Sequence, residues 1–265
     1  MGMSFLYPDH KLKAVTMSYD DGVREDIRLI EIFNKYGIIG SFHINSALLG
    51  DDRRVAPEEV KEVYAGHEIS CHSAGHPFPD HVPRTEWVRQ VWEDRRRLEE
   101  LAGYPVTGMS YPYNVSHKDT VDICRTVGIE CARHGGASNN FLLPQDFLYW
   151  TPTCHHKDAA GLIDKFKNCR YALSLFFIWG HAYEFGRNPE VCGWEDMENI
   201  CRALGNDPEV WYATNLQVCR YIKAVRSAVT SCDGKMIYNP SGIALWFICN
   251  GEKYILQPGE TMSFA

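Results

Sequence analysis

Two adjacent carboxylates and a pair of histidines are the residues most suited to chemistry in this chain. Asp20 and Asp21 directly follow the apolar segment 15–19, a pattern typical of a buried strand that ends in a loop. About fifty residues later, His72 and His76 stand four positions apart after a second short apolar run. One carboxylate and two imidazoles can hold a metal ion and leave a coordination position open.

This residue set predicts the roles in a metal-assisted hydrolysis. Asp21, His72 and His76 are expected to bind one divalent cation, for which Zn²⁺ suits nitrogen and carboxylate ligands and Co²⁺, Ni²⁺ or Mn²⁺ are alternatives. Asp20 is then free to act as a general base. His181, at the end of a later apolar strand, would protonate the leaving group.

Short apolar strands alternate with amphipathic helices over most of the chain. This alternation predicts an α/β fold, a distorted (β/α) barrel of about seven parallel strands, with an open doubly wound sheet as the alternative. The predicted strands cover residues 14–19, 40–44, 68–72, 108–111, 129–133, 173–179 and 210–213. The predicted helices cover residues 24–36, 57–65, 84–102, 117–127, 159–170, 194–204 and 216–228.

The last part of the chain has a different pattern. Short β-prone runs at 235–238, 243–249, 253–256 and 261–264 are separated by turn pairs, of which Asn250-Gly251 is the strongest hairpin signal. We therefore expect a barrel domain over residues 1–228 and a small antiparallel β appendage over residues 229–265. The appendage is too small to fold alone, so it should pack on the barrel.

Polar residues follow several of the predicted strands. Barrel enzymes build their active sites at the carboxyl ends of the strands, so these side chains are candidates for one shared site. His43 and Asn45 would either line that site or form a hydrogen-bonded pair at a strand end. Cys154, His155, His156 and Cys169 offer further metal ligands, but their spacing matches no recognised metal-binding pattern.

Four segments resemble the motifs of the polysaccharide deacetylases, carbohydrate esterase family 4. Segments 18–22, 72–77, 111–113 and 179–181 match the family's first, second, third and last motifs in order, and the resemblance covers roughly residues 12–225. It implies a distorted (β/α) barrel and a metal-dependent deacetylase. It also implies that Asp20 is the base, that Asp21, His72 and His76 bind the metal, and that His181 is the acid.

The third motif carries two further expectations. By resemblance, the backbone N–H of Tyr113 stabilises the oxyanion that forms on the attacked carbonyl. Ser110 stands where the family often has an arginine that braces the base, and Arg133 at the next strand end is expected to replace it from another direction. Tyr113 and Arg133 are thus the predicted substrate-binding residues. The family's fourth motif is matched only loosely, at 145–150.

The resemblance leaves three functions open. The first is removal of an acyl group, chiefly acetyl, from an N-acylated sugar or polysaccharide. The second is hydrolysis of another C–N bond in a small amide or ureide, which related barrels without the bracing arginine perform. The third is carbohydrate binding without turnover, against which the presence of a complete base, metal triad and acid argues.

Bulk properties limit the partners and the location. The net charge is −7 with no basic stripe, which disfavours nucleic acid and anionic membranes, whereas a homo-oligomer stays open. The run Arg95-Arg96-Arg97 lies among acidic residues in a helical pattern typical of a solvated face. The N-terminal segment lacks the features of a secretory signal, so a cytoplasmic location is expected unless a signal has been removed. The ten cysteines form no C-x-x-C pair, which favours buried free thiols.

Overall fold

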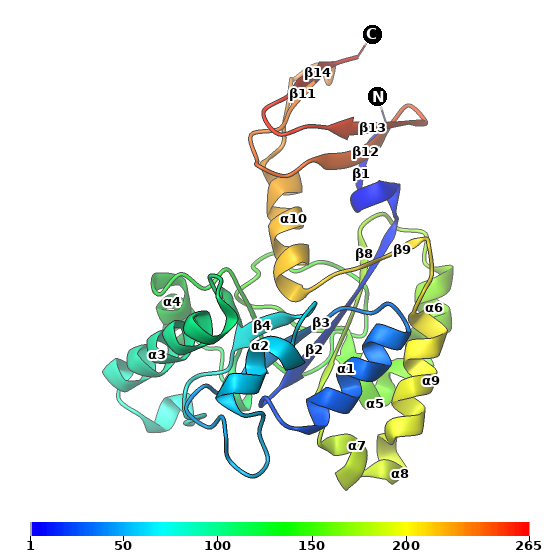
Figure 1. Ribbon diagram of the computed structural model, residues 1–265. Coiled ribbons are helices and arrows are strands. Elements are labelled where there is room, and N and C mark those ends of the chain that lie inside the picture. Colours follow the sequence, from blue (N-terminus) through cyan, green and yellow to red (C-terminus); the bar gives the residue numbers. More distant parts are fainter. Residues whose placement is uncertain (1, 265) are drawn as a thin grey trace.

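The computed structural model describes residues 2–264 and contains one curled parallel sheet (Figure 1). Its eight strands are β2 (Lys13–Asp20), β3 (Gly40–Ile44), β4 (Glu68–Cys71), β5 (Gly108–Ser110), β6 (Cys131–Arg133), β7 (Cys154–His155), β8 (Ser174–Gly180) and β9 (Val210–Tyr212). The hydrogen-bonded order is β6-β5-β4-β3-β2-β8-β7, and β9 pairs with the first residues of β2. Seven of these strands match the predicted ones. The two residues of β7 are too few for a periodic pattern.

The segment between β6 and β7 nearly closes the sheet into a barrel. Trp150 lies beside β6, where its backbone N–H donates to the carbonyl of Ala132 at 3.2 Å and its own carbonyl accepts from His134 at 3.2 Å. A few residues later, the N–H of Thr153 donates to the carbonyl of Phe177 in β8 at 2.8 Å. The same segment therefore reaches both edges of the sheet. The predicted distorted (β/α) barrel is confirmed.

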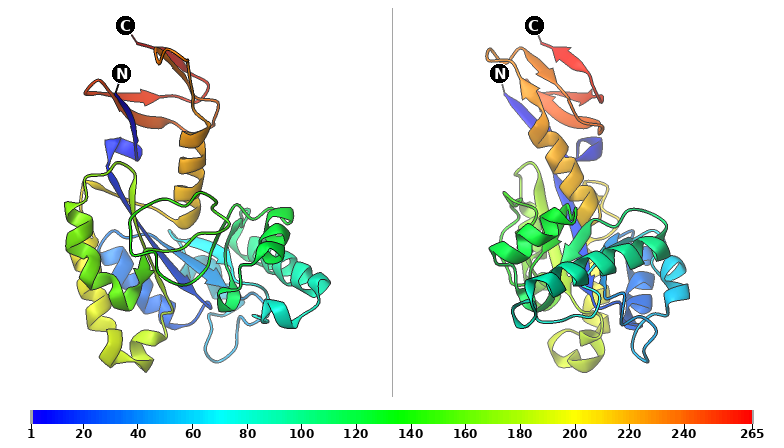
Figure 2. Two further views of the ribbon diagram at one scale, coloured as in Figure 1. Left: turned by 180° about the vertical axis from the view of Figure 1, so that it is seen from behind. Right: turned by 90° about the vertical axis from the view of Figure 1, so that its left-hand side faces the viewer.

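Helices flank the sheet on its outer side (Figures 1 and 2). The longest, α3, shows why they form: Trp87, Val91, Asp94 and Leu98 recur at helical spacing and are all buried, and Gly103 ends the helix with a left-handed φ of 79°. The helices are α1 (Glu25–Lys35), α2 (Val60–Val63), α3 (Arg84–Ala102), α4 (Lys118–Thr126), α5 (His156–Ala159), α6 (Ile163–Asn168), α7 (Glu184–Arg187), α8 (Pro189–Cys192), α9 (Trp194–Leu204) and α10 (Asn215–Ser227). Short 3₁₀ turns lie at Pro8–His10, Pro57–Glu59, Pro79–His81, Pro112–Asn114 and Ala160–Leu162.

Strand β2 lies in the middle of the sheet and positions the acidic pair. All of its residues are buried, as expected for a central parallel strand that is covered on both faces. Because side chains alternate along a strand, Val15, Met17 and Tyr19 join the main hydrophobic core, whereas Ser18 and Asp20 share the opposite face. The last residue of the most buried strand is thus a carboxylate.

Antiparallel strands at the C-terminal end form two small sheets. One sheet orders β1 (Met3–Leu6), β12 (Leu245–Cys249) and β13 (Glu252–Leu256), and the other orders β10 (Val229–Thr230), β11 (Met236–Tyr238) and β14 (Thr261–Ser263). Asn250 and Gly251 form the predicted hairpin turn, with φ values of 52° and 88°. The predicted division of the chain at residue 228 stays a prediction, and the pairing of Met3–Leu6 with β12 was not foreseen. Both sheets lie at the end of the molecule opposite the carboxyl ends of the barrel strands (Figures 1 and 2).

The cysteines are free thiols, as their spacing in the sequence predicts. All ten cysteines are free thiols, and eight of them are buried. Within residues 2–264, no helix combines the length and the apolar character that crossing a bilayer would require.

Candidate metal and active site

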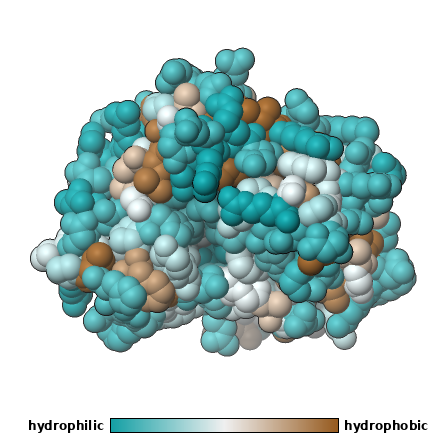
Figure 3. Space-filling model, turned by 90° about the horizontal axis from the view of Figure 1, so that it is seen from below, coloured by the Kyte–Doolittle hydropathy of each residue, from teal (hydrophilic) through white to brown (hydrophobic). Residues whose placement is uncertain are grey.

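The strand register brings the ends of separate strands to one place. Asp20 lies opposite His43 in β3, and Tyr19 lies opposite Gly180 in β8, so that His181 follows at the same level. Cys71, which precedes His72, pairs with both β3 and β5. Figure 3 looks onto this end of the barrel, where the surface is hollowed near its middle.

Asp21, His72 and His76 form a compact cluster at this end. The Asp21 Oδ1 atom lies 3.7 Å from His72 Nε2 and 3.8 Å from His76 Nε2, and the two imidazole nitrogens are 3.2 Å apart. Ligands around a tetrahedral Zn²⁺ stand roughly 3.3–3.6 Å from one another, given bonds of about 2.0–2.2 Å. The three atoms therefore have the mutual spacing of a metal-ligand set.

The surroundings of the histidines fit a divalent cation. The His72 Nδ1 atom lies 2.9 Å from the carbonyl oxygen of Ser110, to which it can only donate, so its Nε2 lone pair faces Asp21 and His76. Metal-binding histidines usually have such a partner for their second nitrogen. Burial lowers the pKa of His76 to about 4, so that this imidazole is neutral at pH 7. The His76 ring is therefore in the form that binds metals.

Asp20 is held as a carboxylate by its neighbours. The Ser110 hydroxyl donates to its Oδ1 at 2.9 Å, and the Arg133 guanidinium contacts both carboxylate oxygens. Burial alone would raise the pKa of Asp20, but the positive charge of Arg133 and the proximity of His72 bring it well below its usual range. Asp20 is therefore ionised at neutral pH beside the metal-ligand cluster.

Arg133 lies behind Asp20. Its side chain is 1% exposed, its Nε donates to the Ser18 hydroxyl at 2.9 Å, and its guanidinium stacks 4.7 Å above the ring of Trp179. This is the position expected of the residue that braces the base. Because the guanidinium is buried, its contacts are with Asp20, Ser18 and Trp179 and not with the solvent-facing surface.

His181 faces Asp20 from the end of β8. Its Nε2 lies 3.9 Å from Asp20 Oδ2, and its Nδ1 is 3.1 Å from Glu184 Oε1. Burial opposes protonation of this imidazole, but the contact with Glu184 and the charge of Asp20 outweigh burial and raise its pKa. The ring also stacks on Tyr183 at 5.1 Å between centroids. His181 is thus suited to carry a proton.

Tyr113 packs beside His76 at the candidate site. Its ring lies 4.6 Å from the His76 ring and 5.0 Å from the Phe78 ring, and 55% of its surface is exposed. Its φ is +55°, and Asp21, Ser73 and His76 also have positive φ. Left-handed backbone at non-glycine residues is uncommon and concentrates at functional sites.

Asp94 supports the site and was not recognised in the sequence. Its carboxylate accepts hydrogen bonds from the backbone N–H groups of Ser46 and His72, both at 2.8 Å, and burial raises its pKa to about 7. Asn45 acts from the other side by donating to the carbonyls of His72 and Ser73 at 2.7 and 2.9 Å. Asp94 directly precedes the run Arg95-Arg96-Arg97, for which a solvated helix face is predicted, but it lies in the apolar stripe of α3 and is buried.

Replacing Asp94 by alanine is expected to lower the free energy of unfolding by about 2–4 kcal/mol, because two buried N–H groups lose their acceptor. Urea denaturation followed by circular dichroism measures this loss. Glu93→Ala is the matched control, since Glu93 precedes Asp94 in the same helix and 39% of its side chain is exposed. Equal stabilities of the two variants would contradict the role given to Asp94.

The comparisons with known proteins agree with this geometry. Residues 8–132 match the family described as polysaccharide deacetylase, which confirms the predicted resemblance. A Mycobacterium smegmatis protein assigned to the polysaccharide deacetylases is 14% identical, with a TM-score of 0.63 over 83% of this chain and 93% of that one. The family 4 acetyl xylan esterase of Clostridium thermocellum, in complex with a cobalt ion, is 15% identical, with a TM-score of 0.52 over 77% and 89%.

A third similar structure is the Xyl-CE4 domain of a multidomain xylanase from the hindgut metagenome of Trinervitermes trinervoides. It is 13% identical, with a TM-score of 0.55 over 81% of this chain and 92% of that one. At these identities the likeness shows a shared fold. The comparison with curated proteins found no match.

Proposed function

We propose that this protein, whose residues 8–132 match the polysaccharide deacetylases, is a metal-dependent hydrolase. It would remove an acyl group, chiefly acetyl, from an N-acylated sugar or polysaccharide. One observation carries this proposal. An ionised Asp20 lies between the Asp21, His72 and His76 cluster on one side and a protonatable His181 on the other. A binding protein needs neither the buried base nor the acid.

Asp21, His72 and His76 would hold one divalent ion, with Zn²⁺ as the first candidate. Such an ion supplies Lewis acidity, which polarises the amide carbonyl and makes water more acidic. The protein's own residues then move the protons. Asp20 accepts a proton from the attacking water as the new C–O bond forms, and His181 donates a proton to nitrogen as the C–N bond breaks. The products are the carboxylic acid and the free amine.

Three contacts prepare these groups for their tasks. Arg133 keeps Asp20 ionised and fixes its orientation. Ser110 links the base to the metal-ligand cluster, because its hydroxyl donates to Asp20 while its carbonyl accepts from His72. The backbone N–H of Tyr113, in the left-handed turn beside His76, is the proposed donor to the oxyanion.

Removal of the metal is the direct test of this proposal. Treatment with a chelator should reduce acetate release from chitooligosaccharides by about 100-fold or more, and one equivalent of Zn²⁺ or Co²⁺ should restore it. The His76→Ala variant should not respond to added metal. A panel of small amides and ureides identifies the alternative substrate class. Bound metal without hydrolysis of any acyl sugar, amide or ureide would contradict the proposed reaction and favour carbohydrate binding.

A further inference from the structure

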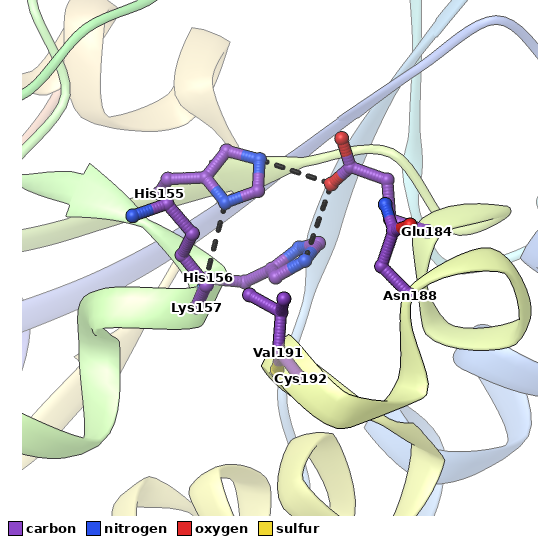
Figure 4. Close-up of a pocket in the computed structure, with 7 residues that line it drawn as sticks. All are labelled: His155, His156, Lys157, Glu184, Asn188, Val191 and Cys192. Atoms are coloured by element: carbon purple, nitrogen blue, oxygen red, sulfur yellow. Dashed lines mark hydrogen bonds and ion pairs between the residues drawn. The ribbon is translucent and has the colours of Figure 1, made fainter.

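A second cluster of two histidines and one carboxylate lies next to His181. His155 ends β7, His156 begins α5, and Glu184 begins α7, so three elements bring these side chains together (Figure 4). Glu184 Oε2 lies 3.0 Å from His155 Nε2 and 3.2 Å from His156 Nε2. The three ligand atoms all lie within 4.8 Å of one another.

This cluster has the composition and the spacing of the first one. Each offers two imidazole nitrogens and one carboxylate oxygen, and the distances from carboxylate to imidazole are shorter here than the 3.7 and 3.8 Å found around Asp21. At 3.0 and 3.2 Å they are somewhat shorter than the roughly 3.3–3.6 Å between ligands of a tetrahedral Zn²⁺. The same set of ligand types therefore occurs a second time in the barrel, next to His181.

Two buried polar atoms of the second cluster, Glu184 Oε2 and His156 Nδ1, have no hydrogen-bond partner among the described residues. Glu184 Oε2 is buried and, among the described residues, accepts no hydrogen bond, although two ring nitrogens lie close to it. Both rings are within ion-pair distance of this oxygen, although neither meets the geometry of a hydrogen bond to it. Buried carboxylate oxygens normally have a partner, because leaving one unpaired costs about 1–3 kcal/mol or more. The Lys157 N–H donates to His155 Nδ1 at 3.5 Å, the long limit for a hydrogen bond.

The position of Glu184 relates this cluster to the proposed catalytic acid. Its Oε1 lies 3.1 Å from His181 Nδ1, while its Oε2 faces the two histidines. One carboxylate thus belongs to both sets. A cavity of about 210 Å³ adjoins the cluster and offers an entry path and room for water ligands. Asn188, Val191 and Cys192 form its other wall (Figure 4).

We propose that His155, His156 and Glu184 bind a second divalent cation of the Zn²⁺ or Co²⁺ type, separate from the cation at Asp21, His72 and His76. The proposal stands on the convergence of three ligand atoms and on a buried carboxylate oxygen that, among the described residues, accepts no hydrogen bond. It does not depend on which substrate the protein hydrolyses. The second ion would hold the Glu184 carboxylate in place behind His181.

Metal titration of the full-length protein tests this proposal. Metal-free protein is titrated with Zn²⁺ and with Co²⁺ by calorimetry, and the metal content is then measured by mass spectrometry after gel filtration. A Cys232→Ser background removes the exposed thiol, which could bind metal by itself. The protein should bind two equivalents. His155→Ala and His156→Gln should each bind one, and His76→Ala should also bind one.

Two further variants complete the design. His117→Ala is the matched control, because His117 pairs with Asp80 on the surface, and it should keep two equivalents. The double variant His76→Ala/His155→Ala should bind none. A single equivalent in the parent protein that His76→Ala loses, or two equivalents retained by both His155→Ala and His156→Gln, would overturn the proposal. A single equivalent that His76→Ala keeps and His155→Ala loses would instead count against the first metal site.

Discussion

The Asp20→Asn variant is expected to turn over substrate about 1,000-fold more slowly than the parent protein while it still binds the first cation. The amide has nearly the shape of the carboxylate but cannot accept a proton from water. The three ligands of the Asp21 cluster are unchanged, so metal affinity should stay within a few-fold. Steady-state acetate release and metal titration on the same preparation measure the two quantities.

The control for this variant is Asp21→Asn. It removes a ligand and leaves the base, so it should lose metal affinity and activity together. Because Asp20→Asn also leaves the buried Arg133 without its counter-charge, the unfolding curve of each variant is recorded, and rates are compared only below the onset of unfolding. Full activity in Asp20→Asn would show that another group takes the proton.

The Arg133→Met variant is expected to lower the free energy of unfolding by about 3–5 kcal/mol at pH 7, because a buried carboxylate loses its counter-charge. The side chains of Arg133 and Asp20 are 1% and 5% exposed, so water cannot replace the lost contact. Without the guanidinium, burial should raise the pKa of Asp20. Urea denaturation at pH 7 measures the stability, and the pH dependence of acetate release shows whether the acidic limb moves to higher pH.

Two comparisons isolate the effect of the buried pair. Arg125→Met removes a guanidinium that pairs on the surface with Asp122 and Asp146, and it should cost no more than about 1 kcal/mol. The double variant Arg133→Met/Asp20→Asn removes both buried charges and should recover most of the lost stability. A loss below about 1 kcal/mol in Arg133→Met would refute the role of Arg133 as the residue that holds Asp20.

The sequence predicts the parts of the site that lie on strand ends. The carboxyl ends of parallel strands meet at one edge, so Asp20, His72 and His181 could be expected together once the strands were recognised. The apolar strands and amphipathic helices were visible as periodic patterns, and α3 and α9 have the predicted bounds. Local pattern was therefore enough to predict the barrel and the convergence of Asp21, His72 and His76.

The remaining features depend on contacts between distant segments. Asp20 and Arg133 are 113 residues apart, and only the closure of the barrel decides that the guanidinium reaches this carboxylate. Glu184 meets His155 and His156 because β7, a strand too short to leave a pattern, pairs with β8, and α7 follows β8 closely in the chain. The pairing of β1 with β12 joins segments near both ends of the chain.

The small sheets that contain β1 and β10 to β14 lie far from the candidate site. They lie at one pole, the hollow face with Asp20 and His181 lies at the other, and both chain ends emerge beside the small sheets (Figures 1 and 2). An affinity tag, a fused partner or a solid support joined at either end would therefore face away from the hollow face. The protein can be attached there and still keep that face open to solvent.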